Sequence, residues 1–154
     1  MTEMDSLQFD NAKLTDIPAL IELLNELFSI EKDFKPDADK QFRGLKMLIE
    51  SPATGTIKVV RDSQGQAVGM VSAQLVISTA QGAPSAWVED MIISQAYRAS
   101  GVGKKLLAEA IAWAKSKGAT RAQLLVDIAN EPALGYYAHL GWQTTQLQAR
   151  KILI

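Results

Sequence analysis

The sequence predicts a single α/β (α+β) domain, and three observations support this. The chain has 154 residues, which is enough for one domain with a sizeable core. Stretches in which apolar residues recur with the helical period alternate with β-rich stretches. Taken in order, these stretches read β-α-α-β-β-β-α-β-α-β, and no internal repeat or linker divides residues 1–154 into two domains.

One strand and two helices are predicted in the first part of the chain. Residues 7–12 fit a short strand, and the apolar residues between positions 15 and 28 fall on one helical stripe. An acidic, proline-containing linker covers 29–39. A second helix is expected over 40–50, before Pro52. We expect four residues of this helix to face the core: Phe42, Leu45, Leu48 and Ile49.

The rest of the chain alternates between predicted strands and helices. A helix should begin at Gly101 and end at Gly118, and a shorter helix should run from Pro132 to Gly141. Strands are expected at 57–60, at 67–78, in a run that ends near Ile93, at 122–127 and in the tail 142–154.

Composition excludes several classes of function. The formal net charge is -1, whereas a general nucleic-acid binder usually carries a basic excess. The sequence has no cysteine, which excludes a disulfide, a thiolate metal site and a cysteine nucleophile. The single His139 cannot make a multi-histidine metal site. Because no apolar signal core or membrane-length run occurs, we expect a cytoplasmic protein with no nucleic-acid or membrane partner.

The segment from Val88 to Leu107 predicts a phosphate-binding turn between a strand and a helix. Gly101 and Gly103 allow the backbone to come close to a ligand, and the first N–H groups of the helix point outward without partners. These donors and the helix dipole bind phosphate groups. Arg98 and Lys104 add positive charge beside them. A simple tight turn is the alternative interpretation.

The spacing of these glycines excludes two common phosphate-binding motifs. The Walker run Gly-x-x-x-x-Gly-Lys-Ser/Thr is missing, and the dinucleotide pattern Gly-x-Gly-x-x-Gly fails because Leu106 stands at its last position. The run Arg98-Ala-Ser-Gly101-Val-Gly103 resembles instead the acetyl-CoA-binding signature Arg-x-x-Gly-x-Gly of the GNAT superfamily of N-acetyltransferases. The segment from Asn130 to Trp142 resembles that family's Asn-x-x-Ala-x-x-Phe-Tyr-x-x-x-Gly-Phe motif.

The order of the predicted elements is also that of the GNAT family, so the resemblance covers nearly the whole chain. It implies a GNAT fold with a mixed, mostly antiparallel central sheet of six to seven strands and about four helices. It further implies acetyl-CoA as co-substrate and a homodimer. The residues that it places at acetyl-CoA are Met91, Ile92, Ile93, Arg98, Ala99, Ser100, Gly101, Val102, Gly103, Lys104 and Asn130. Ala99 stands where the family frequently has glycine, which makes the turn less permissive.

A finer similarity concerns the acceptor. Glu89-Asp90 ahead of Met91-Ile-Ile, together with Asn130-Glu131-Pro132, resembles the diamine and polyamine acetyltransferases. In that branch the segment after the first helix meets the amine. The resemblance therefore implies a small cationic amine as substrate, with acidic substrate-binding residues at Glu31, Asp33 and Asp90. A solvated acidic loop is the alternative interpretation of Glu31 and Asp33.

Acetyl transfer to an amine requires the amine to lose a proton. An alkylamine with a pKa of ~10.4 costs about 4.6 kcal/mol to deprotonate at pH 7. Glu89 is the best candidate base, because it lies on the strand that leads into the acetyl-CoA loop. Asp90 should point to the opposite face of the sheet, so at most one of the two is the base. A solvated strand residue is the alternative interpretation of Glu89.

The leaving thiolate must gain a proton, and a phenol can supply it. The resemblance assigns this role to Tyr137, whose alternative role is to pack its helix. Carbonyl polarisation would come from a backbone N–H within residues 91–93, where the strands of the family separate and pair with pantetheine.

The sequence thus predicts an enzyme, an acetyl-CoA-dependent N-acetyltransferase that moves acetyl to a primary amine by direct transfer in a ternary complex, without a metal. A diamine or polyamine is the first expectation for the acceptor. The alternatives are a protein N-terminal or lysine acetyltransferase and a non-catalytic acyl-CoA-binding sensor. Tyr137 and Glu89 argue against the sensor, because a pure binder needs neither. No motif identifies the acceptor itself.

Overall fold

The computed structural model describes residues 6–31 and 35–154, and the chain forms two compact units. The first comprises residues 1–123 and the second residues 124–154. The first unit carries the sheet and the helices that pack on it, and the second carries a shorter helix and the C-terminal tail. The single domain over 1–154 stays a prediction.

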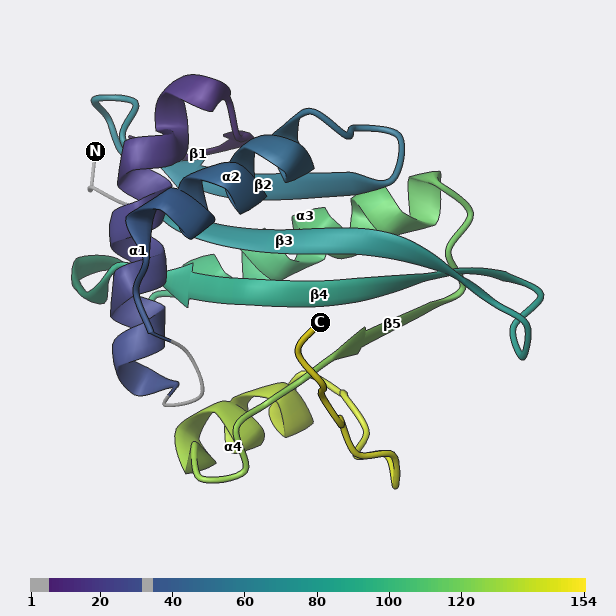
Figure 1. The fold of residues 1–154 in the computed structure, drawn as a ribbon. Helices are drawn as coiled ribbons and strands as arrows, with labels where there is room; N and C mark the ends of the chain where they lie inside the picture. The colour runs from purple at the N-terminus through teal and green to yellow at the C-terminus, as the bar shows by residue number, and fades with distance from the viewer. Residues whose placement is uncertain (1–5, 32–34) are drawn as a thin grey trace. The chain divides into compact units, whose positions relative to one another are not determined.

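The described residues form a five-stranded sheet whose strands lie in sequence order (Figure 1). Neighbouring strands from the first to the fourth pair antiparallel, and turns join the second to the third and the third to the fourth. A helical crossover joins the fourth strand to the fifth, which runs in the same direction. The strands are β1 (Gln8–Asn11), β2 (Gly55–Arg61), β3 (Ala67–Ser78), β4 (Ala83–Ile93) and β5 (Arg121–Leu124).

Helices cover both faces of this sheet (Figure 1). Helices α1 (Ile17–Ile30) and α2 (Ala38–Ile49) lie on one face, and α3 (Val102–Ser116) lies on the other. The apolar stripe of α1 packs on the sheet in a core cluster that includes Leu20, Leu24, Val59 and Met70. Because an amphipathic stripe must be buried to stabilise its helix, these contacts confirm the predicted helices, with small differences at their ends.

Helix α2 differs from the prediction in the residues that it buries. Leu45 is buried, but Phe42, which we expected in the core, is 47% exposed. The buried stripe follows Gln41, Leu45 and Leu48, which are spaced i, i+4 and i+7, and Phe42 lies one position beyond it. Gln41 is tied to α1, because its Nε2 donates a hydrogen bond to Asn25 Oδ1 at 3.0 Å.

Strand β4 contains a β-bulge. Two of its residues, Asp90 and Met91, face the single residue Val71 of β3. Asp90 has a φ of 54°, in the left-handed region, which aspartate tolerates better than most residues. We expected Glu89 and Asp90 to point to opposite faces because regular strands alternate. The bulge interrupts this alternation and removes the basis of that expectation.

The second unit consists of α4 (Glu131–His139) and the tail that follows. The predicted strand over 142–154 is wrong, because the tail contains no strand. The run Gln143–Gln146 is polar throughout and offers no apolar face, and Leu147 and Leu153 are 82% and 89% exposed. The described part of the chain therefore has five strands, and the prediction of six to seven was wrong. The predicted strand over 122–127 also ends early, at Leu124.

Candidate active site

Three carboxylates of the first unit lie near one another at the end of β4. Glu89 and Asp90 belong to β4, and Glu31 follows the last residue of α1. Glu89 and Glu31 both raise the pKa of Asp90, so both are within electrostatic reach of it. Glu89 is exposed, whereas Asp90 and Glu31 are partly buried. These are three of the four acidic site residues that we predicted, and the fourth, Asp33, lies outside the described residues.

The pKa of Asp90 is raised from its ordinary value of 3.8 to about 6. Burial is the largest cause, because it disfavours the charged form, and repulsion by Glu89 and then by Glu31 adds to it. Among the described residues, every charged group that shifts this pKa is another carboxylate. A carboxylate with this pKa is mostly ionised at pH 7 and suits a general base. Asp90, which we predicted to bind substrate, is therefore a candidate base beside Glu89.

No sequence signal indicated that Asp90 is the partly buried carboxylate with the raised pKa. The residues on either side of it form a normal strand pattern, and a positive φ at an aspartate leaves no trace in the apolar alternation. The adjacent pair Glu89-Asp90 was the only available signal, and it does not tell which of the two carboxylates is buried.

The loop between β4 and α3 leaves the start of α3 open for an anion. Gly101 is the N-cap residue with a φ of 81°, and no side chain caps the helix. A Cβ atom added to Gly101 would meet no atom within 4 Å, so the space beside its backbone is open. The first N–H groups of α3, in Val102, Gly103 and Lys104, lie at the positive end of the helix dipole. This arrangement fits the predicted phosphate group.

Arg98 lies beside this helix start with part of its guanidinium in use. Its Nε donates a hydrogen bond to Ile93 O at 2.7 Å, and its Nη2 is 3.9 Å from Glu26 Oε1. The two side chains of this ion pair are 40% and 41% exposed, so the pair is weak and can yield to a phosphate. Ala99 has a φ of 61°, which confirms that alanine is less suited than glycine to this turn. Ser100 Oγ donates a hydrogen bond to Tyr97 O within the same loop.

The last residues of β4 extend beyond the strand beside it. Strand β5 has 4 residues against 11 in β4. The two strands meet near their starts, where Thr120 N–H donates a hydrogen bond to Pro84 O at 3.1 Å. Because they run in the same direction, β5 ends before it reaches the segment Met91–Ile93. The backbone edge of this segment is therefore not paired with β5. A strand that binds pantetheine needs such an unpaired edge.

The second unit carries the two remaining predicted residues. Asn130 is the N-cap of α4, and its Oδ1 accepts a hydrogen bond from Ala133 N–H at 3.3 Å. The ring of Tyr137 makes edge contacts with Tyr136 and Trp142, with ring centroids 5.4 and 6.0 Å apart. Asn130 therefore caps the start of α4. The contact of Asn130 with acetyl-CoA and the acid role of Tyr137 stay predictions.

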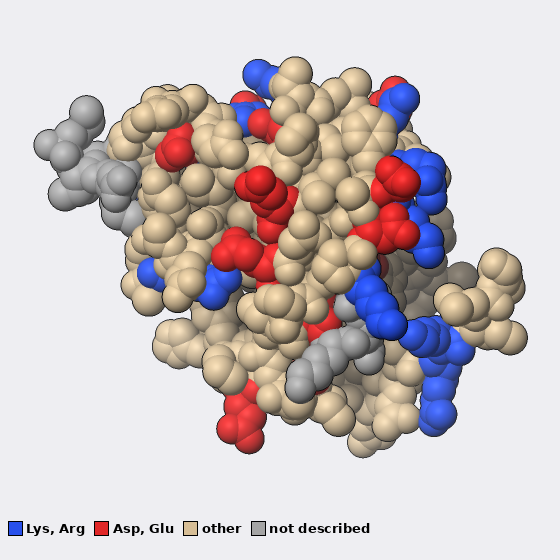
Figure 2. All heavy atoms as spheres, turned by 60° about the vertical axis from the view of Figure 1, so that its left-hand side comes forward, with Lys and Arg blue, Asp and Glu red and all other residues tan. Residues whose placement is uncertain are grey.

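A polar cavity of about 210 Å³ lies between α1 and the start of β3. Glu22 and Glu26 of α1 line it, together with Gln66 and with Ser94, which directly follows β4. Figure 2, which brings the α1 side of the first unit forward, shows acidic side chains gathered near the middle of the face in view. No predicted site residue among those described lines this cavity, although Glu26 faces Arg98 at its border.

Residues 6–31 and 35–154 hold neither a metal-binding cluster nor a helix that could span a membrane. No group of three or more metal-ligating side chains in these residues is arranged to hold a metal ion. None of their helices combines the length and the apolar character needed to cross a membrane.

Comparisons with known proteins agree with this geometry. Residues 17–142 match the Acetyltransferase (GNAT) family. No curated protein sequence gives a significant match. Similar solved structures include an acetyltransferase from Trypanosoma brucei, with 24% identity and a TM-score of 0.74 over 96% of this chain and 99% of that chain.

Two more of the similar structures have named acceptors. One is glucosamine-6-phosphate N-acetyltransferase from Arabidopsis thaliana, with 17% identity and a TM-score of 0.76 over 96% of this chain and 99% of that chain. The other is an aminoglycoside acetyltransferase from an uncultured soil metagenomic sample, in complex with sisomicin. It has 19% identity and a TM-score of 0.73 over 99% of this chain and 98% of that chain. At these identities the likeness shows a shared fold.

Proposed function

The chain belongs to the GNAT acetyltransferase family and is an N-acetyltransferase, and we propose that its acceptor is a small cationic primary amine such as a diamine or polyamine. The cluster of Glu31, Glu89 and Asp90 carries this proposal. Within the described residues, the charges that act on Asp90 are all negative, so the cluster favours a positively charged group. A cationic amine would relieve this repulsion on binding.

The named neighbours leave the acceptor open. One acts on glucosamine-6-phosphate and another was solved with the aminoglycoside sisomicin, so one fold accommodates different acceptors. The choice must therefore come from residues of this chain. A protein N-terminal or lysine acetyltransferase is the alternative, since those acceptors are also amines. The match to an acetyltransferase family favours an enzyme over the non-catalytic sensor.

We assign to Asp90 the role of proton acceptor. Its carboxylate would take one proton from the bound ammonium group and leave a neutral amine with a free lone pair. The rise in the pKa of Asp90 from 3.8 to about 6 lowers the free-energy cost of this transfer by about 3 kcal/mol. Glu89 stays the alternative base. Glu31, with Glu89, would hold the distal ammonium of a diamine.

Acetyl-CoA, the co-substrate of GNAT enzymes, supplies the acetyl thioester when bound. Gly101 to Lys104 and Arg98 would hold its phosphates, and the family motif assigns Asn130 a further contact with it. The unpaired edge of Met91–Ile93 would hold its pantetheine arm and place a backbone N–H at the carbonyl oxygen. Tyr137 would protonate the leaving thiolate, and Tyr137→Phe should then lower turnover about ten-fold or more while acetyl-CoA binding is kept.

The acceptor class is tested by a thiol-release assay over an amine panel at several ionic strengths. Attraction between exposed charges is screened over a Debye length of about 10 Å at 0.1 M salt. The KM for a diamine should therefore rise with salt and rise further in Glu31→Gln, while the KM for acetyl-CoA stays nearly constant. A monoamine with a neutral tail should show less of both effects. Equal or better turnover with peptide N-termini, and no effect of Glu31→Gln, would reject the diamine in favour of the protein acceptor.

Three further proposals rest mainly on the family. We propose that the two units form one catalytic domain, because the family match at 17–142 runs across both. We also propose a homodimer and a cytoplasmic location. Light scattering on the purified protein tests the dimer by its mass, and fractionation of the source cells tests the location.

A further inference from the structure

We propose that Ser72, a residue of β3 with no place in the predicted site, positions Asp90 by fixing the peptide bond that precedes it. The proposal rests on the proposed role of Asp90 in the reaction. Ser72 is 1% exposed, and its Oγ donates a hydrogen bond to Glu89 O at 3.1 Å. A buried hydroxyl needs such a partner, because water cannot reach it.

Because it lies at the bulge, this hydrogen bond restricts the backbone conformation of Asp90. Glu89 O is the carbonyl oxygen of the peptide bond between Glu89 and Asp90. The orientation of that peptide plane is set by ψ of Glu89 and φ of Asp90, so a hydrogen bond that holds the oxygen restricts both angles. Asp90 has a φ of 54°, which an unrestrained aspartate in a strand would not favour. Ser72 therefore helps to hold Asp90 in the conformation that the bulge requires.

This conformation decides where the carboxylate of Asp90 lies. In β3, Ser72 is the first residue that pairs with β4 after the register shift, and its partner is Glu89. On the other side of the shift, Met70 and Ile92 resume the ladder, and both are buried. Asp90 thus lies between a peptide bond held by Ser72 and the paired end of β4, within electrostatic reach of Glu31, which follows α1. Without the Ser72 hydroxyl, the peptide can rotate and Asp90 can move toward solvent and away from Glu31.

Ser72→Ala removes the hydroxyl and tests the proposal. The expected result is a fall in kcat of about ten-fold, since a misplacement of roughly 1 Å can cost up to about 100-fold. The KM for acetyl-CoA should stay near that of wild type. The ¹³C NMR titration of the Asp90 carboxyl in the free protein should move toward a lower pH, because Asp90 becomes better solvated. Ser72→Thr keeps the hydroxyl and should restore both properties.

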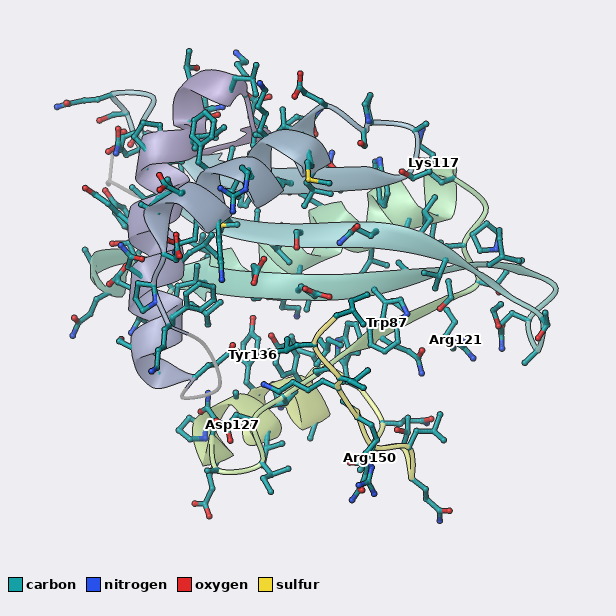
Figure 3. The ribbon with its side chains drawn as sticks, in the orientation of Figure 1. Trp87, Lys117, Arg121, Asp127, Tyr136 and Arg150 are labelled. Carbon is teal, nitrogen blue, oxygen red and sulfur yellow. The ribbon has the colours of Figure 1, made fainter. Side chains whose placement is uncertain are left out.

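Ser85→Ala is the matched control. Ser85 is also fully buried in the sheet, in β4, but its hydroxyl contacts Arg121 at the start of β5, where it donates to Arg121 O at 3.3 Å. Figure 3 labels Arg121 at that end of the sheet. Ser85→Ala should leave the titration of Asp90 unchanged. If Ser72→Ala does not fold, Ser72→Cys fills the site with a slightly larger side chain that is a much weaker donor, and it should give the same shift.

The two readouts separate this proposal from the role of Asp90. An unchanged Asp90 titration in Ser72→Ala or Ser72→Cys, with a kcat equal to that of Ser85→Ala, overturns the positioning role. A shifted titration in Ser72→Ala, combined with wild-type turnover in Asp90→Asn, supports positioning but overturns the role of Asp90 as base.

Discussion

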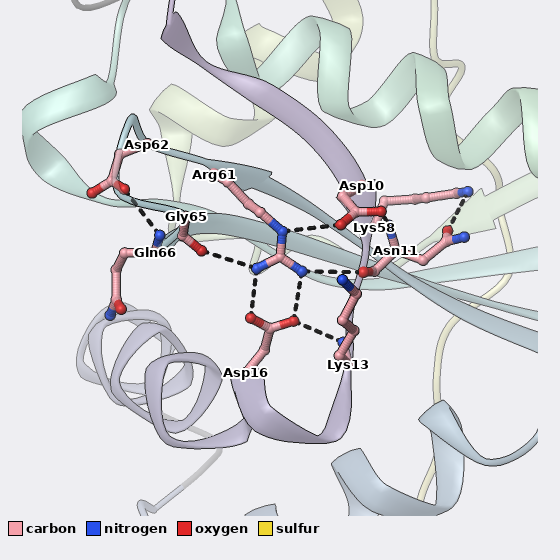
Figure 4. A network of polar contacts seen from close by, with 9 residues as sticks. All are labelled: Asp10, Asn11, Lys13, Asp16, Lys58, Arg61, Asp62, Gly65 and Gln66. Atoms are coloured by element: carbon pink, nitrogen blue, oxygen red, sulfur yellow. Dashed lines mark hydrogen bonds and ion pairs between the residues drawn. The ribbon is translucent and has the colours of Figure 1, made fainter.

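Two acidic clusters of the first unit show opposite electrostatic behaviour. Around Arg61, two carboxylates and two backbone carbonyls share one guanidinium (Figure 4). Arg61 Nη1 and Nη2 donate to the two oxygens of Asp16 at 2.6 and 2.8 Å, and Arg61 Nε lies 3.1 Å from Asp10 Oδ2. Around Asp90, in contrast, the charges that act on the carboxylate within the described chain come from Glu89 and Glu31.

The pKa shifts express this difference. The lowered pKa of Asp10 has a backbone hydrogen bond from Asn11 as its largest cause, followed by the hydrogen bond from Arg61. Burial raises the pKa of Asp16, but hydrogen bonds from Arg61 and from Lys13 N–H outweigh it, and the pKa is lowered overall. The pKa of Asp90 is raised. Burial raises the pKa of both Asp16 and Asp90, so the charge of the neighbouring groups decides whether the net shift is downward or upward.

The largest expected effect on the free energy of unfolding comes from removing Arg61 from its cluster with Asp10 and Asp16. Arg61→Met keeps much of the side-chain volume but leaves Asp16, whose side chain is 10% exposed, without its cation. Removing one partner of a buried pair costs about 3–5 kcal/mol, because the remaining charge stays buried. Urea denaturation at pH 7 measures the free energy of unfolding. A double variant, Arg61→Met with Asp16→Asn, should recover part of the loss, and equal values for the two variants would show that Asp16 gains little from Arg61.

Asp90→Asn should change the free energy of unfolding by a smaller amount and in the opposite direction. A folded-state pKa raised to about 6 means that the folded state binds the proton more tightly than the unfolded state does. Ionisation of Asp90 therefore destabilises the fold above pH 6, and this destabilisation disappears as pH falls from 6 toward 4. Asp90→Asn should accordingly raise the free energy of unfolding at pH 7 by about 1–3 kcal/mol. The gain should vanish near pH 4, and a loss of stability at pH 7 would contradict the raised pKa.

The smallest effect is expected from Asp10→Asn. Asp10 contacts the same guanidinium, but its side chain is 41% exposed, and exposed ion pairs contribute about 0–1 kcal/mol. Because its folded-state pKa is lowered, its contribution is present above about pH 4 and is lost as pH falls below that value. Thermal unfolding at pH 7 and pH 3 measures it. A loss as large as that of Arg61→Met would mean that exposure does not separate Asp10 from Asp16.

The sequence predicted most of the fold, because periodic apolar patterns carry it. The stripe of α1, the β-rich run of β3 and the glycine at the start of α3 each gave an element close to its observed bounds. The strand prediction for the tail was wrong because a strand forms only beside a pairing partner, and no residue pattern in 142–154 indicates such a partner. The prediction that Phe42 faces the core was wrong, because an apolar residue at the margin of a helical stripe can face either the core or the solvent.

The site residues stay a prediction, and no sequence pattern indicated the electrostatics around Asp90. The family motifs located Arg98, Gly101, Glu89 and Asp90, but the β-bulge depends on the pairing register of β3 and β4, which no local pattern states. We predicted no role for Arg61, because the carboxylates that surround it, Asp10 and Asp16, lie far away in the sequence. Long-range pairing of this kind decides pKa values, and only the folded chain shows it.

The pH dependence of kcat/KM for a diamine tests the central claim, that Asp90 is the proton acceptor, most directly. In wild type the acid limb should have a midpoint near the pKa of Asp90, about 6. In Asp90→Asn this limb should disappear, with turnover at pH 7 reduced by roughly 100-fold or more. Glu89→Gln should keep the limb and move it to lower pH, since one repelling charge is gone. An acid limb near pH 6 that persists in Asp90→Asn and disappears in Glu89→Gln would contradict the account and make Glu89 the base.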